Sequence, residues 1–357
     1  MSDLLARLGM DHPIIQAPMA GTSTPAMAAA VCNAGGLGSL GLASAGADGA
    51  RKMIAETQAL TNRAINVNLF CHQTFAPDPA RDARWIETLR GEFAKFGAEP
   101  PALLRDIYKS FLIDDDMLEV LLALKPQVVS FHFGLPQKEK IAALKKNGAV
   151  LFSSATNLDE ARAAAEAGMD AVVAQGYEAG GHRGMFDPRA SDDQLSMAVL
   201  TEILAARLSV PVIAAGGIMN GAGIASALKL GAVAAQLGTA FVGCAESAAD
   251  AGYRAALASE AALHTTMTAA ISGRPARCLA NKFTSLSERG IDAANIAAYP
   301  NTYDLGKALN AAAKAKGETG YGAQWAGQGA PLARFLPAAE LMAALISELK
   351  SSLKENP

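Results

Sequence analysis

Two apolar runs late in the chain end in glycine-rich turns. The run at 210–217 closes on a glycine pair and leads into a helical stretch, and the run at 232–239 closes on Gln-Leu-Gly-Thr. Glycine lets the backbone approach a ligand closely, and the free N–H groups at a helix start attract phosphate. Paired turns of this kind predict a phosphate-bearing ligand. The residues expected to hold it are Gly216, Gly217, Gln236, Leu237, Gly238 and Thr239.

An earlier run ends in Gln175 and continues into a loop with Gly180, Gly181 and His182. A carboxamide at a strand end can face a ring with donors and acceptors, such as an isoalloxazine edge, and the glycines would let the loop pass a flat cofactor. Histidine titrates near neutral pH, so His182 could take a proton or stabilise an anion. With the phosphate turns, this loop predicts flavin mononucleotide (FMN) as cofactor and His182 as the catalytic residue. The alternative for His182 is a loop histidine bonded to its own backbone.

Three more strand ends could contribute to the same site. Met19 follows a proline and could lie under a flavin ring. Asn68 shares a strand face with Asn66 and lies nearer the strand end, which makes it the better ligand candidate, although an inter-strand polar layer is the alternative. His132 ends another run and could touch a substrate pocket, while a satisfied core histidine fits the sequence equally well.

In the last third of the chain, Tyr299, Tyr303 and Lys307 recur at i, i+4 and i+8. On a helix they would share one face, and Pro300 indicates that such a helix begins here. Lys307 aimed into a pocket would favour an anionic substrate. The alternative is an ordinary amphipathic surface.

The elements that must position these residues alternate in type. Apolar runs without polar alternation, typical of strands buried on both faces, are separated by alanine-rich helical stretches with N-cap and C-cap signals. Eight strands with intervening helices predict an α/β fold, a (β/α)8 TIM-type barrel, with a doubly wound open sheet as the alternative. The eight runs cover residues 13–19, 37–43, 64–70, 128–134, 149–155, 170–176, 210–217 and 232–239. Helices are predicted at 24–34, 158–167, 195–208, 221–230, 248–257 and 338–353.

Two segments depart from this alternation of strands and helices. An insertion at 71–117 follows the third strand, and residues 244–357 follow the eighth. Both start at the carboxyl ends of the strands, where barrel active sites lie. We therefore expect a barrel at 1–243 and a C-terminal helical extension at 244–357 that caps the site. The alternative is extra packing on the outside of the barrel.

The composition narrows the function classes. The 357 residues carry a formal net charge of -3 without a basic run, so nothing favours a nucleic-acid partner. No apolar run approaches the roughly 18 residues of a membrane helix, and the N-terminus lacks a secretory pattern. The four cysteines are scattered, which predicts reduced thiols in a cytoplasmic protein and no metal site.

Taken together, these segments resemble the nitronate monooxygenase family, most closely its bacterial class I enzymes. The similarity runs nearly end to end and rests on PIIQAPM, NAGGLGSLG, NVNLFCH, VSFHFG, VVAQGYEAGGHRG, PVIAAGGIM, AVAAQLGTAFV and YGAQWAGQG. It implies an enzyme that oxidises alkyl nitronates, above all propionate 3-nitronate, with O2 to a carbonyl product and nitrite. It also implies FMN without a nicotinamide partner.

The resemblance assigns roles to individual residues. His182 matches the active-site histidine of the family. The residues that match its FMN contacts are Met19, Asn68, Gln175, Gly180, Gly217 and Gln236 through Thr239. The residues that match the class I substrate pocket are Tyr108, Tyr299, Tyr303 and Lys307. Tyr177 departs from the smaller aliphatic residue common in relatives, which puts only the local pocket shape in question.

Three other functions fit parts of this pattern. An FMN-dependent enoyl-thioester reductase would need NAD(P)H and room for an acyl chain. A purine-nucleotide dehydrogenase would need a nucleophilic cysteine in the loop that here carries His182. A flavin-binding module would bind FMN without turnover. The expected partners are a small anionic nitronate and O2, and the expected assembly is a monomer or homodimer.

Overall fold

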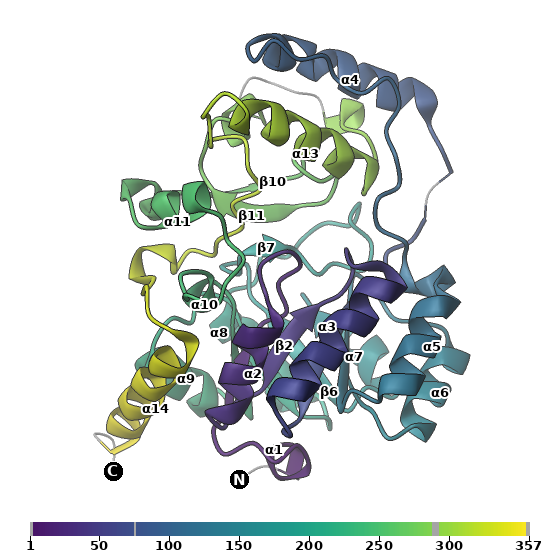
Figure 1. The fold of residues 1–357 in the computed structure, drawn as a ribbon. Coiled ribbons are helices and arrows are strands. Elements are labelled where there is room, and N and C mark those ends of the chain that lie inside the picture. Colours follow the sequence, from purple (N-terminus) through teal and green to yellow (C-terminus); the bar gives the residue numbers. More distant parts are fainter. Residues whose placement is uncertain (1–2, 75, 288–292, 355–357) are drawn as a thin grey trace.

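Eight parallel strands form a nearly closed barrel in the computed structural model, which describes residues 3–74, 76–287 and 293–354 (Figure 1). The hydrogen-bonded order is β1-β9-β8-β6-β5-β4-β3-β2, and a parallel bridge between Ile15 and Leu37 joins its two ends. The barrel strands are β1 (Ile14–Gln16), β2 (Gly38–Gly41), β3 (Ile65–Phe70), β4 (Val128–His132), β5 (Val150–Ala155), β6 (Ala171–Gln175), β8 (Val212–Ala215) and β9 (Ala234–Leu237).

Each of the eight predicted runs contains one of these strands, so the TIM-type barrel is confirmed and the open sheet is excluded. Every residue of β5 and β6 is buried. Strands covered on one face by barrel side chains and on the other by helices need apolar residues on both, which explains the missing alternation.

A ring of helices covers the outside of the barrel. They are α2 (Pro25–Asn33), α3 (Gly46–Leu60), α5 (Asp115–Leu124), α6 (Lys138–Lys146), α7 (Leu158–Glu166), α8 (Met197–Arg207), α9 (Gly221–Lys229) and α14 (Ala338–Lys354). The predicted caps are present, since the side chains of Thr24 and Asn157 accept N–H bonds at the starts of α2 and α7. The last helix, α14, packs on α9 and α2 and so closes the ring.

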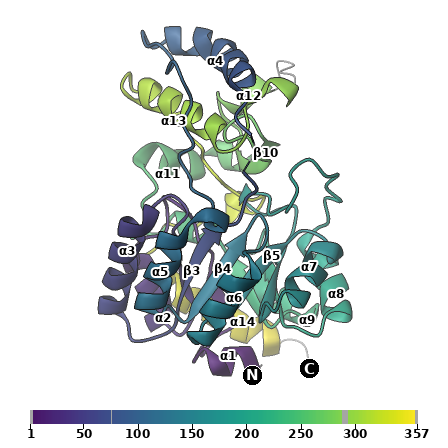
Figure 2. The ribbon, with the colours of Figure 1, turned by 90° about the vertical axis from the view of Figure 1, so that its right-hand side faces the viewer.

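A second layer stands over the carboxyl ends of the barrel strands (Figure 2). We call it the cap. It consists of α4 (Pro79–Ala94), α11 (Ala251–Leu257), β10 (Thr265–Thr268), β11 (Ala276–Leu279), α12 (Thr284–Ser287) and α13 (Asn301–Lys314). The shorter elements are α1 (Asp3–Arg7), β7 (Gly181–His182), α10 (Thr239–Val242) and the 3-10 turns η1 (Phe111–Ile113), η2 (Glu260–Leu263), η3 (Ala293–Asn295) and η4 (Ala330–Leu332).

The cap has an apolar core of its own. Trp85, Leu89 and Phe93 of α4 pack with Leu305 and Leu309 of α13, and all five are buried. The insertion after β3 and the extension after β9 therefore meet in one body, as Figures 1 and 2 both show. This arrangement places the cap over the active-site end of the barrel.

The extension is more varied than the sequence suggested. Besides helices it contains β10 and β11, which form a three-stranded antiparallel sheet with β7. Its helix α13 begins at Asn301, so Tyr299 lies before the helix and not on the shared face predicted with Tyr303. The division of the chain at residue 243 stays a prediction.

Candidate active site

A cavity opens at the carboxyl ends of the barrel strands, beneath the cap. Most of the residues singled out in the sequence line it. They are Met19, Asn68, Tyr108, His132, Gln175, Gly180, Gly181, His182, Gly216, Gly217, Gln236, Gly238, Thr239 and Tyr303. Three others lie elsewhere. Leu237 is buried between the barrel and its outer helices, Tyr299 is buried beside the cavity, and Lys307 lines an adjoining pocket.

One end of the cavity has the features of a phosphate cradle. Gly216 and Gly217 have φ values of 126° and 68°, which L side chains rarely adopt. Next to them α10 begins at Thr239, and the first N–H groups of a helix have no partner within it. A Cβ on Gly238 would lie 3.5 Å from Ala17 Cβ and 3.8 Å from Met19 Sδ, and so would fill part of the cradle. These residues therefore fit a phosphorylated planar cofactor such as a flavin nucleotide.

A segment of the extension covers this cradle. The N–H of Gly327 donates to Thr239 Oγ1 over 3.0 Å, and Trp325, Gly327 and Gly329 all line the cavity. A Cβ on Gly329 would come within 2.9 Å of the Gly217 carbonyl oxygen. These residues were not predicted individually. Their signal in the sequence was the motif YGAQWAGQG at 321–329, which contributed to the family resemblance without any of its residues being assigned to the site.

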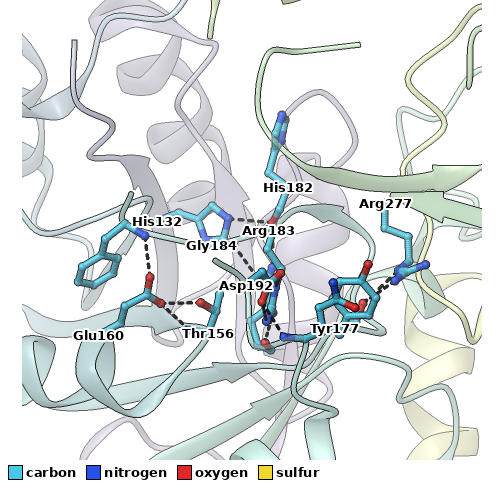
Figure 3. Close-up of polar contacts among 12 residues, drawn as sticks. His132, Thr156, Glu160, Tyr177, His182, Arg183, Gly184, Asp192 and Arg277 are labelled. Atoms are coloured by element: carbon cyan, nitrogen blue, oxygen red, sulfur yellow. Dashed lines mark hydrogen bonds and ion pairs between the residues drawn. The ribbon is translucent and has the colours of Figure 1, made fainter. Parts of the chain in front are cut away.

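Gln175 uses its carboxamide to hold the loop that carries His182. Its Nε2 donates to the His182 carbonyl at 2.9 Å, and its Oε1 accepts from the Gly184 N–H at 2.7 Å. Arg183, buried beside it, donates to the Gln175 carbonyl at 2.5 Å and pairs with Asp192 at 2.8 and 2.9 Å. These hydrogen bonds and the ion pair hold the main chain of the His182 loop in place (Figure 3).

The same loop is held on its other side by Glu160 of α7. One carboxylate oxygen accepts from the Thr156 N–H and hydroxyl at 2.7 and 2.8 Å, and the other accepts from the Phe186 N–H at 2.8 Å. Figure 3 shows the His182 side chain pointing away from this network. Its position is therefore set by the barrel, while its ring remains available to the cavity.

The His182 imidazole lies among aromatic rings. Its centre is 5.0 Å from that of Trp325, 5.5 Å from Phe133 and 5.7 Å from Tyr299, and its Nε2 lies 2.9 Å from Ser272 Oγ in the β10–β11 loop. Burial, with smaller electrostatic contributions from His132, Arg274 and His72, lowers the pKa of His182 to about 3. The ring is therefore neutral at physiological pH.

His132 lines the cavity but has protein partners on both ring nitrogens. Its Nδ1 lies 2.5 Å from Ser154 Oγ, and its Nε2 lies 3.1 Å from the His182 carbonyl oxygen. Burial lowers the pKa of His132 to about 4. A neutral ring that donates from Nε2 and accepts at Nδ1 satisfies both contacts. This arrangement fits a core histidine whose two ring nitrogens both have hydrogen-bond partners, which was one of the two possibilities that the sequence left open. It also makes His132 a support for the main chain of His182.

Asn68, which lies nearer the end of β3, and Asn66 occupy different surroundings. Asn68 lines the cavity and donates from Nδ2 to Ser130 Oγ at 2.9 Å. Asn66 does not line it and donates to Ser39 Oγ at 3.0 Å inside the barrel. Asn68 is therefore the one placed to meet a ligand.

Tyr108 and Tyr303 form an aromatic wall between the cavity and the adjoining pocket, since both line both spaces. Lys307 Nζ lies on the pocket side, 4.8 Å from the Tyr108 ring centre and 5.1 Å from that of Tyr303. Partial burial lowers the pKa of Lys307. A cation over two rings beside the cavity is suited to a ligand anion.

Tyr177, the departure noted in the sequence, does not line either space. The Arg277 guanidinium carbon lies 4.7 Å from its ring centre, and Arg277 also donates to its carbonyl at 2.9 and 3.0 Å (Figure 3). Arg183 lies 5.8 Å away on the same ring. The larger side chain therefore packs with arginines outside the cavity.

The comparisons with known proteins agree with this geometry. The family described as "Nitronate monooxygenase" matches residues 2–348. The chain belongs to the nitronate monooxygenase family. It is 62% identical to a nitronate monooxygenase of Paraburkholderia phytofirmans, over 99% of this chain and 96% of that one. It is 51% identical to a nitronate monooxygenase of Pseudomonas aeruginosa, over 98% and 100% of the two chains.

A solved structure of a nitroalkane oxidase from Streptomyces ansochromogenes superposes with a TM-score of 0.90 at 39% identity, covering 99% of this chain and all of that one. The family resemblance seen in the sequence is therefore confirmed, and this nitronate monooxygenase is a flavin-dependent oxidoreductase. Among its described residues there is no helix long and apolar enough to cross a membrane and no His, Cys, Asp and Glu group that could hold a metal ion.

Proposed function

We propose that this enzyme binds FMN and oxidises small alkyl nitronates with O2, releasing a carbonyl compound and nitrite, with propionate 3-nitronate as a preferred substrate. The observation that carries the proposal is the position of His182. Its neutral ring borders a cavity that joins a phosphate cradle at one end to an aromatic wall with a lysine behind it at the other.

Specific residues would hold the cofactor. Gly216, Gly217, Gly238 and Thr239 would receive the phosphate, while Met19 and Asn68 would lie against the ring system. Gln175 Nε2 already donates to the His182 carbonyl, so its second N–H is the group left for the ring edge. When bound, FMN would supply the capacity to take electrons from the substrate and transfer them to O2.

His182 would orient the nitronate through a hydrogen bond. The Ser272 hydroxyl has one proton and two acceptors within reach, the Arg274 carbonyl at 3.1 Å and His182 Nε2 at 2.9 Å. When it donates to Nε2, Nδ1 carries the imidazole proton and can donate it to a nitronate oxygen. A preformed nitronate is already the electron-rich anion, so no proton has to be removed. A neutral imidazole suits this task, because it donates a hydrogen bond without surrendering a full charge.

Lys307 would select substrates with a second anionic group. Its ammonium lies behind Tyr108 and Tyr303, and it forms no ion pair within the described parts of the chain. A carboxylate a few atoms from the nitronate could pass the aromatic wall and reach it. Propionate 3-nitronate has this layout, which is why we favour it.

One set of measurements tests the proposal. The purified protein should show the visible spectrum of bound FMN, and propionate 3-nitronate should cause O2 uptake with nitrite release. Rapid reduction of the flavin by NADH in air-free buffer, without turnover of nitronates, would instead indicate an enoyl-thioester reductase. A flavin spectrum with neither reaction would indicate a binding module, and a protein unable to take up FMN would refute the proposal.

A further inference from the structure

Arg274 is a buried cation that has no acidic partner among the residues that the structure describes. It lies in the β10–β11 loop of the cap and is 1% exposed. Its Nη2 donates to the Met185 carbonyl, its guanidinium carbon lies 4.1 Å from the Phe133 ring centre, and its Nε has no hydrogen-bond partner among the described residues. No carboxylate in the described ranges lies within ion-pair distance of it. A charge is costly to bury without an ionic partner, so the burial of Arg274 calls for a functional explanation.

The nearest acids are already engaged elsewhere. Asp187 and Glu160 act on Arg274 only at longer range. Asp187 pairs with Arg189 at 3.1 Å, and Glu160 accepts three hydrogen bonds from Thr156 and Phe186. Arg183, a second buried arginine of this region, differs in pairing directly with Asp192. The positive field of Arg274 is thus left uncompensated.

The positive charge of Arg274 lies close to the active site. Phe133, on whose ring Arg274 lies, touches the His182 ring edge-on with 5.5 Å between centres and 89° between planes. Ser272 of the same loop contacts His182 Nε2, and β11 pairs with β7 at Ala276 and His182. Arg274 therefore stands one aromatic ring behind His182 and is fixed there by the loop that also holds the imidazole.

We propose that Arg274 is a positioning residue that adds positive potential to this active site from behind Phe133 and makes the cavity favourable for small anions. The anions would be the nitronate substrate and the nitrite product, so this part rests on the proposed function.

Other groups also act on His182 and must be separated from Arg274. From β4 comes His132, from the segment after β3 comes His72, and from the cap come Tyr299 and Tyr303. The two histidines are neutral, with their pKa values lowered to about 4 by burial, and burial raises the pKa values of both tyrosines. Burial also lowers the pKa of Arg274, to about 10, so it keeps its proton. Of these groups around His182, Arg274 is therefore the one that carries a charge at neutral pH.

The test uses the holoenzyme with Arg274→Met and Arg274→Lys. Arg277→Met is the matched control, since Arg277 is buried in the neighbouring strand but faces Tyr177. Binding of sodium nitrite and of neutral nitroethane is followed through the visible spectrum of the flavin. We expect Arg274→Met to weaken nitrite binding by about tenfold while nitroethane binding is unchanged, and Arg274→Lys to restore most of the nitrite affinity.

Equal losses for nitrite and nitroethane, or nitrite binding that is unchanged in Arg274→Met, would overturn the proposal. If Arg274→Met does not fold, Arg274→Gln serves as the neutral variant with the same criteria. Absence of O2 uptake with nitronates would refute the proposed function and leave these readouts intact.

Discussion

His182 combines a fixed position with a free ring nitrogen. Its carbonyl is held by Gln175 and His132, and Nε2 is in contact with Ser272. Its main chain is thus held by the barrel and by pairing with β11 of the cap, and its side chain is in contact with the cap through Ser272. Most contacts that hold the loop are therefore made by the main chain of His182 and not by its ring. A substitution of the side chain should leave the loop in place.

His182→Asn should therefore remove turnover without releasing the cofactor. Loss of a positioned hydrogen-bonding or proton-transfer group costs about 10² to 10⁴-fold in rate, and we expect a fall in kcat/KM within this range. O2 uptake with propionate 3-nitronate gives the rate, and the visible absorbance after gel filtration gives the FMN content. His264→Asn, an exposed histidine of the cap, is the control. Unchanged turnover in His182→Asn would reject the assigned role.

Lys307 should act on binding of the substrate's second charge. In Lys307→Met we expect KM for propionate 3-nitronate to rise about tenfold, as for loss of a charge-assisted contact, with little change for ethyl nitronate, which has no carboxylate. Steady-state kinetics with both substrates checks this. Lys316→Met, an exposed lysine just after α13, is the matched control. A similar rise in KM for both nitronates would contradict the carboxylate assignment.

At the scale of elements, the close approach of two loops builds the roof of the cofactor cradle. Gly180 of the His182 loop packs on the segment that contains Gly327, and a Cβ on Gly180 would lie 2.4 Å from Gly327 N and 2.6 Å from Ala326 C. Both contacts are main chain, which cannot rotate away as a side chain would. The glycine therefore sets the distance between barrel and extension.

Gly180→Ala should push these loops apart. We expect weaker FMN retention and a loss of about 1–3 kcal/mol in the free energy of unfolding, the usual cost of overpacking. Gly91→Ala is the matched control, because Gly91 lies in α4 with nothing within 4 Å of its added Cβ. There the change should be neutral or stabilising by up to about 1 kcal/mol. Urea unfolding and FMN titration measure both effects, and equal behaviour of the two variants would contradict the steric argument.

The sequence predicted the positions of the strands better than it predicted the contacts between segments far apart in the chain. Apolar runs with glycine turns located all eight barrel strands, because burial on both faces leaves a local signature. No local pattern indicated that Ser272 would meet His182, or that residues 181 and 182 would pair with β11. Those contacts join segments about a hundred residues apart in the chain and arise from the packing of the cap. Tyr299 is a further example. Its spacing from Tyr303 predicted a position on the same helix, but it lies before α13 and packs in the cluster with Tyr108 and Phe133 from there.

At the scale of the whole molecule, barrel and cap meet around a buried group of histidines. His72 follows β3, His132 ends β4, and His182 lies in β7, which pairs with β11 of the cap. Burial holds the pKa values of His72 and His132 at about 4 and that of His182 at about 3, against 6.5 for an exposed histidine. Protonation of any of them therefore favours the unfolded chain, in which the ring is exposed.

The sign of the resulting pH dependence follows from linkage. A histidine whose pKa is depressed in the folded state contributes stability above pH 6.5, and that contribution is lost as the pH falls toward the folded value near 4. Each such group gives a slope of about 1.4 kcal/mol per pH unit between those limits, so three give up to about 4 kcal/mol per pH unit near pH 5. Urea unfolding between pH 7 and pH 4.5 should show this decline. His182→Asn should reduce the slope by about one third, whereas His264→Asn should leave it unchanged. A stability that stays constant from pH 6.5 to pH 5 would mean that these rings are already protonated or solvated in the folded protein, and would remove the basis for a neutral His182.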